Sequence, residues 1–196
     1  SAVTCTECPT GYYQAQTAQT DCDDCAAGKF QDQQGQTAEA ACKDCAAGKY
    51  QDTAAQSACV DCVDGKFKAA AGVNTVCDNC VDGKYVTAGT NTACINCAIG
   101  TYVTAGANAA CINCAVGLYQ DQVGQSDCED CAKGTYNDQV AQDAAADCKN
   151  CGTGKYNAQL ARTEEGACTE CVAGKFNDQE AQTSADDCDQ CAAGKY

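Results

Sequence analysis

The sequence predicts a small disulfide-rich repeat array, an elongated solenoid-like rod of short β-hairpins and coil with little helix. All 22 cysteines fall in eleven Cys-x-x-Cys pairs, a share at which a disulfide scaffold becomes the leading interpretation. The pairs recur every 17 to 20 residues, a periodicity typical of a linear array. We therefore expect residues 1–196 to form one continuous tandem array of about ten repeats, with no separate globular domain.

The repeating unit is a short cassette that starts at the second cysteine of each pair. In its first copy, Gly11 follows Cys8 by three residues and Tyr13 follows it by five, and a glycine and an aromatic keep these offsets in all eleven copies. A glycine at this point suits a turn with positive φ, after which the aromatic ring can be buried across the sulfurs. We expect this part of each repeat to be a rigid turn.

The rest of each repeat varies in length, because all variation falls between the aromatic and the next cysteine. A returning strand or loop that tolerates insertion is expected there. Alanine-rich inserts such as residues 141–146 are long enough for one helical turn, although so short a helix is marginal alone.

The second residue between the paired cysteines always carries a side-chain carbonyl oxygen. Asp, Asn, Glu and Gln all occur there, as Asp24, Asn79, Glu170 and Gln190 illustrate. Because amides alternate with acids, we interpret this residue as an acceptor that caps a turn. A calcium ligand is the alternative, although a hard cation favours carboxylates over amides.

Composition and charge exclude several classes of partner. A formal net charge of −15 argues against nucleic acid and anionic lipid. The apolar runs are far shorter than the ~20 residues that cross a bilayer, so we expect no membrane contact by this segment. The sequence has no methionine, which indicates a mature product or a fragment without its signal peptide.

The cysteines support three chemistries: disulfides, zinc sites and redox activity. Cys-x-x-Cys pairs 15 to 20 residues apart also suit zinc, but eleven pairs are an odd number and would leave one over. Redox activity needs an electropositive thiolate at a helix start, which an acidic array does not offer. Disulfides are favoured because one aromatic per repeat cannot offset the ordering entropy of about 17 residues. The spacing alone leaves their connectivity open.

The stretch CPTGYYQAQTAQTDCDDC and its copy CAAGKFQDQQGQTAEAACKDC resemble the ephrin-receptor-like cysteine-rich repeat. They are also similar to the first half of tumour-necrosis-factor-receptor modules and to cysteine-rich surface proteins of protists. The resemblance covers the whole chain. Two features depart from it: the proline usual after the second cysteine occurs only as Pro9, and the additional half-module of those receptors is absent.

The resemblance implies a disulfide from each second cysteine to the next pair's first. This predicts the bonds Cys8–Cys22, Cys25–Cys42, Cys45–Cys59, Cys62–Cys77, Cys80–Cys94, Cys97–Cys111, Cys114–Cys128, Cys131–Cys148, Cys151–Cys168 and Cys171–Cys188. This pattern leaves Cys5 and Cys191 without a partner. We expect each to form a disulfide with another subunit or with repeats outside this segment.

The sequence offers no chemistry for catalysis. It has no histidine, hence no Ser/His/Asp or Cys/His arrangement, and its glycines belong to the cassette rather than to a phosphate-binding loop. We predict a protein that is not an enzyme and needs no cofactor or metal. The expected function is an extracellular or cell-surface structural protein that forms a filament or coat stalk by self-association. The alternative is a cysteine-rich ectodomain segment of a receptor or adhesion protein.

One stretch, residues 85–120, contains no charged residue. Either one neutral repeat was duplicated there, or the stretch is a lateral contact surface, since interface centres are depleted of charge. Its threonines lie among small neutral residues, and we predict that they carry O-linked glycans. They are Thr87, Thr90, Thr92 and Thr104.

Overall fold

The computed structural model describes residues 5–87, 89, 91–106 and 109–195. The chain divides into two compact units. Unit 1 comprises Ser1–Val81, Tyr85–Ile95 and Ala105–Ala110, and unit 2 comprises Asp82–Lys84, Asn96–Thr104 and Cys111–Tyr196. Both units are built from the same repeat. We number the repeats 1 to 10 by their second cysteines, from Cys8 to Cys171.

Regular structure consists of two-residue strands and four short 3-10 turns. The strands are β1 Tyr12–Tyr13, β2 Asp23–Asp24, β3 Lys29–Phe30, β4 Lys43–Asp44, β5 Lys49–Tyr50, β6 Val60–Asp61, β7 Lys66–Phe67, β8 Asp78–Asn79, β9 Lys84–Tyr85, β10 Ile95–Asn96, β11 Thr101–Tyr102, β12 Ile112–Asn113, β13 Leu118–Tyr119, β14 Glu129–Asp130, β15 Thr135–Tyr136, β16 Lys149–Asn150, β17 Lys155–Tyr156, β18 Thr169–Glu170, β19 Lys175–Phe176 and β20 Asp189–Gln190. The 3-10 turns are η1 Glu39–Ala41, η2 Ala145–Asp147, η3 Glu165–Ala167 and η4 Ala185–Asp187.

Each repeat contributes one antiparallel hairpin, so the described residues hold ten two-stranded sheets. In repeat 3 the register sets Tyr50 opposite Val60 and Lys49 opposite Asp61. The predicted turn precedes the first strand: Lys49 N–H donates to Ala46 O across Gly48, whose φ is 78°. A glycine at the third position of a four-residue turn with positive φ is the requirement of a type II turn. The glycine prediction is therefore confirmed.

Repeats of different length differ at one place. The four 20-residue repeats, numbers 2, 8, 9 and 10, each carry one 3-10 turn immediately before the cysteine that closes the loop. The helical turn expected within residues 141–146 lies at Ala145–Asp147. The extra residues of a long repeat therefore form a local turn and leave the hairpin unchanged.

The core of most repeats is built from sulfur and amide rather than from aromatic rings, and in repeats 5 and 6 the buried valines Val86 and Val103 follow the aromatic. Most second cysteines are buried, and Cys25 and Cys114 are completely so. The residue after the aromatic is buried beside them, as Gln31 and Asn137 show. The aromatics themselves are only half-buried in repeats 1 to 9. The expectation of a buried ring in each repeat was wrong, because in most repeats the residue after the aromatic is more deeply buried than the ring.

The second residue between the paired cysteines is a strand residue, not the turn cap that its chemistry suggested. Asp24, Asp44 and Asn150 each end the returning strand of a hairpin and are exposed. The Asp44 carboxylate pairs with Lys29 on the opposite strand, at 2.9 Å. This position faces a cross-strand neighbour, and the turn-cap prediction is wrong for these residues.

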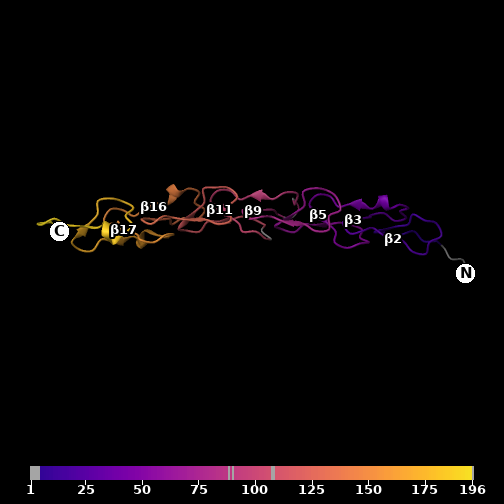
Figure 1. The fold of residues 1–196 in the computed structure, drawn as a ribbon, viewed down its shortest axis with the longest axis horizontal. Helices are drawn as coiled ribbons and strands as arrows, with labels where there is room; N and C mark the ends of the chain where they lie inside the picture. Colours follow the sequence, from indigo (N-terminus) through magenta and orange to yellow (C-terminus); the bar gives the residue numbers. More distant parts are fainter. Residues whose placement is uncertain (1–4, 88, 90, 107–108, 196) are drawn as a thin grey trace. The chain divides into compact units, whose positions relative to one another are not determined.

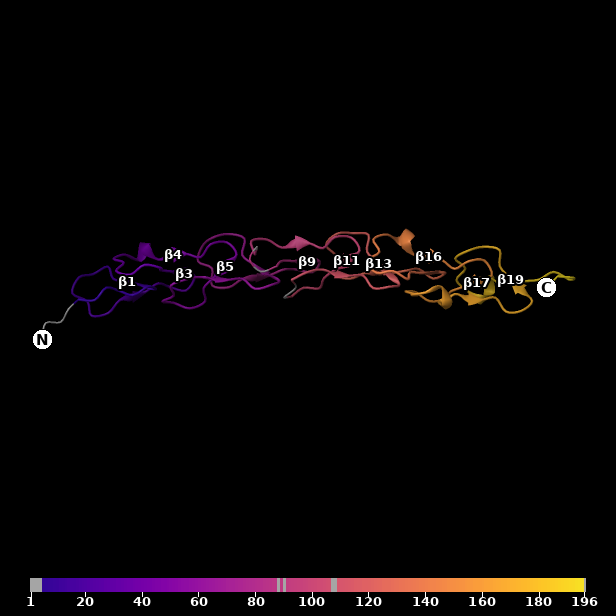
Figure 2. The ribbon, with the colours of Figure 1, turned by 180° about the vertical axis from the view of Figure 1, so that it is seen from behind.

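Within each unit, consecutive hairpins follow one another in sequence order, as Figures 1 and 2 show. In the described part of the chain, no helix is long and apolar enough to cross a membrane.

Candidate functional site at the junctions between repeats

Ten disulfides close the loops of repeats 1 to 10. Each joins the second cysteine of one pair to the first cysteine of the next pair, the connectivity that the family resemblance implied. The Cα atoms of the bonded cysteines lie 5.8 Å apart in repeat 1 and 5.6 Å apart in repeat 2. Such distances are typical of disulfides. The bonds define a series of closed loops that the junctions then bring together.

Successive repeats are joined by backbone hydrogen bonds that recur at every junction described. The N–H of the cassette glycine donates to the carbonyl of the residue after the next aromatic. In unit 1 Gly28 donates to Gln51, and in unit 2 Gly134 donates to Asn157. Nine junctions share this bond, with N···O distances of 2.7–3.0 Å. A second bond runs back, from Ala55 N–H to Cys25 O and from Ala181 N–H to Cys151 O.

The cassette glycine also contacts the repeat after the next one. A Cβ atom at Gly100 would lie 2.5 Å from Ala141 O, and one at Gly117 would lie 2.5 Å from Ala161 O. In unit 1, Gly11 meets the backbone of Ala55 in the same way. These glycines are therefore needed twice, for positive φ and for close backbone approach.

The loop corner at this contact is itself strained. Ala55, Ala141 and Ala161 occupy left-handed backbone conformations, with φ of 60°, 59° and 54°. Gly35 and Gly124 stand at the equivalent corners of repeats 2 and 7, with φ of 68° and 72°. An alanine in this conformation costs ~1–2 kcal/mol relative to ordinary backbone.

The buried amide after the aromatic exists in two forms that bond to different partners. As Gln it stays within its own loop: Gln120 Nε2 donates to Asp127 O, next to the closing cysteine, at 2.8 Å. As Asn it reaches the preceding repeat: Asn137 Nδ2 donates to Leu118 O at 2.9 Å, and Asn157 Nδ2 donates to Thr135 O at 3.0 Å. A difference of one methylene group thus determines whether the amide bonds within its own loop or to the preceding repeat.

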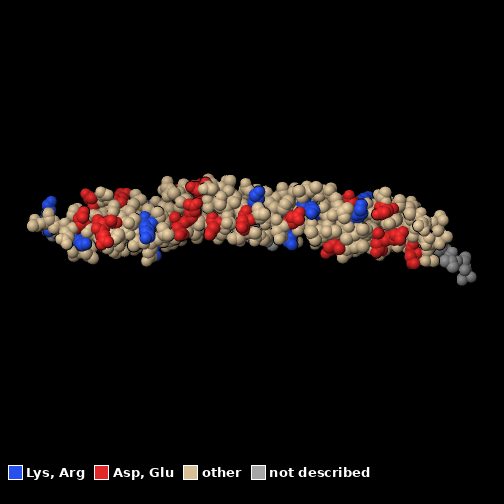
Figure 3. All heavy atoms as spheres, viewed as in Figure 1, with Lys and Arg blue, Asp and Glu red and all other residues tan. Residues whose placement is uncertain are grey.

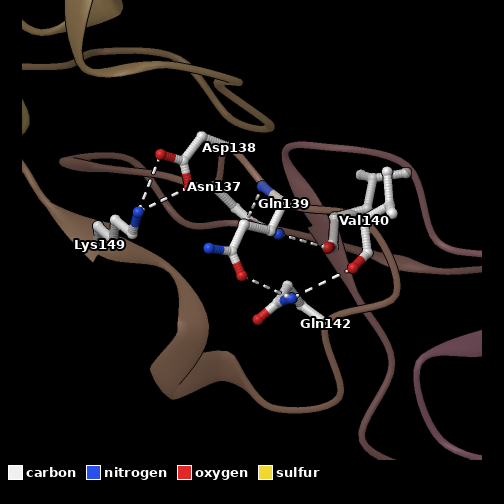
Figure 4. A network of polar contacts seen from close by, with 7 residues as sticks. Asn137, Asp138, Gln139, Val140, Gln142 and Lys149 are labelled. Atoms are coloured by element: carbon white, nitrogen blue, oxygen red, sulfur yellow. Dashed lines mark hydrogen bonds and ion pairs between the residues drawn. The ribbon is translucent and has the colours of Figure 1, made fainter.

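The other amide oxygen has a constant role. Asn137 Oδ1 accepts from Gln139 N–H at 3.0 Å, two residues along the loop, and Gln120 Oε1 accepts equivalently from Gln122 N–H. Figure 4 shows how the side chains of Gln139 and Gln142 extend this network along the loop of repeat 8. Each buried amide that follows an aromatic therefore also shapes the loop after it.

In repeats 4 and 5, where the residue after the aromatic is not an amide, a loop asparagine replaces it. Val86 is completely buried in repeat 5, and Asn91 turns inward from the loop. Asn91 Nδ2 donates to the carbonyls of Cys62, Val63 and Lys66 in the preceding repeat, at 2.8–3.0 Å. The amide hydrogen bond to the preceding repeat is kept, although the amide now comes from a different position in the loop.

The outer face of the hairpins carries exposed ion pairs. Lys149 Nζ lies 2.7 Å and 2.9 Å from the two oxygens of Asp138 and 5.9 Å from the centre of the Tyr136 ring. The hydrogen bond lowers the pKa of Asp138 and raises the pKa of Lys149. On the face in Figure 3, acidic and basic side chains are interspersed along both units. Exposed pairs of this kind contribute little to stability.

The hairpin of repeat 7 has a different pair. Tyr119 Oη donates to Glu129 Oε2 at 2.9 Å across the two strands. This hydrogen bond is the main cause that raises the pKa of Tyr119. Among the described residues no group of three or more Cys, Asp or Glu side chains is placed to hold a metal ion.

The remaining predicted site residues lie apart from the junctions. Cys5 is exposed and Cys191 half-buried, and neither forms a disulfide in this structure. Thr87, Thr92 and Thr104 are exposed, whereas Thr90 lies outside the described residues. The burial of this amide was not predicted from the sequence, although its signal was present: Gln or Asn follows the aromatic in seven of the ten loops.

The geometry defines a disulfide-rich array of ten hairpin repeats with a head-to-tail junction. The family model described as tyrosine-protein kinase ephrin type A/B receptor-like matches residues 1–42 and 100–148, just under half of the chain. The chain contains cysteine-rich repeats of this type, and the repeats outside the matched segments carry the same cassette and disulfide. No curated protein matches the chain at a significant level.

Proposed function

We propose that this chain is an extracellular structural protein that forms a filament or a surface-coat stalk by repeat stacking and self-association. Ten disulfides and repeats of the ephrin-receptor-like type suit an extracellular or secreted module. The proposed role is mechanical spacing, so it requires no catalytic residues and no cofactor.

The observation that carries the proposal is the polarity of the junction. In repeat 8, Gly134 N–H donates to Asn157 O of the next repeat, and Asn137 O accepts from Gly117 N–H of the preceding one. Each repeat therefore has two different binding surfaces, one of which fits the other. A contact of this heterologous kind adds units in a line unless the rotation happens to close a ring.

Cys5 and Cys191 extend the same logic to covalent bonding. Cys5 holds the first position of its pair and Cys191 the second, and elsewhere these two positions are bonded between successive pairs. We propose that each forms a disulfide outside this chain, with a second copy or with further repeats. Either bond continues the series of closed loops.

Lateral association needs a surface where the net charge of −15 does not oppose contact. The uncharged stretch of residues 85–120 is our candidate, and Ile95 and Ile112 within it are about half exposed. We also propose O-linked glycans on Thr87, Thr92 and Thr104. Intact mass spectrometry tests the glycans, because a mass equal to the bare oxidised chain rules them out.

Electron microscopy of the oxidised protein at physiological salt tests the self-association. We expect filaments, and we expect fewer and shorter ones for a Cys5→Ser, Cys191→Ser variant, whose ten loop disulfides stay intact. Particles of single-chain size for both proteins, across a range of concentrations, would refute the filament.

A receptor or adhesion ectodomain segment is the second candidate, and the description of the matched family favours it. It predicts a single-chain protein that binds a ligand through its loops. Saturable binding to a purified extracellular protein, together with absence of filaments, would favour this candidate over the first.

A further inference from the structure

We propose that tension along this chain is carried by the disulfides and the two-residue spacers inside each Cys-x-x-Cys pair, so that the loops bear no load. The proposal adds a mechanism to the structural role proposed above. It depends on the disulfide connectivity, and it holds whether or not the chain assembles into filaments.

The covalent path is plain in repeat 2. A pull that reaches Cys25 crosses the disulfide to Cys42, over a Cα–Cα distance of 5.6 Å, and continues through Lys43 and Asp44 to Cys45. Residues 26–41, which include the turn, the first strand and η1, form a closed loop beside this path. The other nine bridged repeats have the same arrangement, with Cα–Cα distances of 5.7–5.9 Å.

The path has the same length in every repeat. One disulfide of 5.8 Å and three backbone steps of ~3.6 Å give a fully stretched step of about 17 Å. The loops differ, because the bonded cysteines are separated by 14, 15 or 17 residues. The spacer is two residues in all eleven pairs, so every change in repeat length falls off the path. This division explains why the loops accept insertions and the spacers do not.

The main groups that form the junctions lie off the path, although the spacer residue Asn150 also donates from Nδ2 to Glu180 Oε2 in repeat 10. The donor Gly134 N–H, the amide of Asn157 and the corner carbonyl of Ala141 all belong to bypassed loops. Tension on the spacers therefore does not extend the segments that form the junctions. Load bearing is therefore assigned to the disulfides and spacers, and most of the junction donors to the bypassed loops.

Single-molecule force spectroscopy on the full chain, held between two marker domains, tests the proposal. In the oxidised chain each bridged repeat is expected to reach no more than about 17 Å. A dithiol reductant gives two electrons and two protons to each disulfide, forms two thiols and becomes a cyclic disulfide itself. Each reduced bond should release about 45–55 Å of loop, roughly 500 Å for all ten.

Two variants locate the path. Cys62→Ser with Cys77→Ser opens one loop, and should lengthen the stretched oxidised chain by about 50 Å. Six Gly/Ser residues inserted after Ala71 should leave the oxidised length unchanged and add about 20 Å only after reduction. The same six residues added after Tyr196 are the control, and should lengthen both forms equally.

These lengths are measured on the stretched chain and do not depend on whether a variant folds. Peptide mapping establishes that the remaining disulfides are intact in each variant. An oxidised wild-type chain that extends in steps of 45 Å or more would overturn the proposal. So would an oxidised insertion variant that is longer than the wild type. Filament formation can fail without affecting either result.

Discussion

Replacing Asn157 with alanine should loosen the junction between repeats 8 and 9. Asn157 is 3% exposed, and its Nδ2 donates to Thr135 O at 3.0 Å and to Gln159 O at 3.1 Å. Its Oδ1 accepts from Gln159 N–H at 3.0 Å. The substitution removes three part-buried hydrogen bonds and leaves the backbone groups of Thr135 and Gln159 without these partners. At about 1 kcal/mol per bond, the local free energy of opening should fall by about 2–4 kcal/mol.

Native-state hydrogen exchange measures this loss directly, because repeat arrays open locally rather than in one transition. Peptides within residues 131–168 should exchange roughly 30-fold to several hundred-fold faster, at tenfold per 1.4 kcal/mol. Repeats 1 to 3 contain none of the affected bonds, so their exchange should not change. Ala158→Ser, at the exposed neighbouring position, is the matched control and should have almost no effect.

Asn157→Gln separates the two amide roles. By analogy with Gln120, the longer side chain should turn to its own loop and abandon Thr135 O. We expect faster exchange at the junction with repeat 8 and near-normal protection within the loop of repeat 9. Unchanged protection in both variants would show that the backbone ladder alone holds the junction, and would refute this account of the amide.

Three further substitutions test the turn, the corner and the electrostatics. Gly100→Ala should destabilise repeats 6 to 8 by about 2 kcal/mol or more in hydrogen exchange, because φ at Gly100 is +73° and the added Cβ would meet Ala141 O. Gly152→Ala is the control and should be close to neutral, because Gly152 has open space around it and no positive φ. Ala55→Gly should stabilise repeat 3 by about 0.5–1 kcal/mol, because glycine relieves the strain of the left-handed backbone at residue 55 by more than it raises the entropy of the unfolded chain. A loss of stability would show that Ala55 is not strained. The Tyr119 phenol should ionise above the ordinary tyrosine pKa of about 10, so its contribution to stability is complete below that pH and is lost as pH rises through the raised pKa. Glu129→Gln should lower the pKa of Tyr119 toward the ordinary value in an absorbance titration, and an unchanged titration would argue against the hydrogen bond.

The hairpin of each repeat was predictable because local chemistry dictates it. Gly48 must adopt positive φ for the type II turn, and a disulfide from Cys45 to Cys59 closes the loop that follows. The single helical turn of the long repeats was also foreseeable, since the extra residues had to form something compact. These features depend on residues close in sequence, which is what a fixed cassette reveals.

The junctions were not predictable to the same depth. Asn157 and Gln120 lie in loops rich in polar residues, and Asn and Gln side chains are exposed in most proteins. The sequence therefore suggests that both side chains face solvent. Their burial follows from backbone carbonyls and N–H groups that the closed loop leaves without partners. The contact of Gly100 with Ala141 depends on how repeat 6 packs against repeat 8. The cysteine spacing does not determine this packing.

The misassigned spacer residues have a similar cause. Asp44 is a residue type that often caps turns. Only its register opposite Lys29 shows that its carboxylate forms an ion pair across the two strands. Asp, Asn, Glu and Gln all suit such an exposed strand position. The residue types were correctly recognised as oxygen acceptors, but the donor they face is set by the hairpin.

The central claim is that each second cysteine is bonded to the first cysteine of the next pair. Non-reducing proteolysis with mass spectrometry tests it most directly, and Lys43 and Lys49 allow Cys45 to be separated from Cys42 by trypsin. The account predicts peptides that link Cys25 to Cys42 and Cys45 to Cys59, and corresponding links along the chain. Bonds within Cys-x-x-Cys pairs, or zinc at one ion per two pairs, would contradict it.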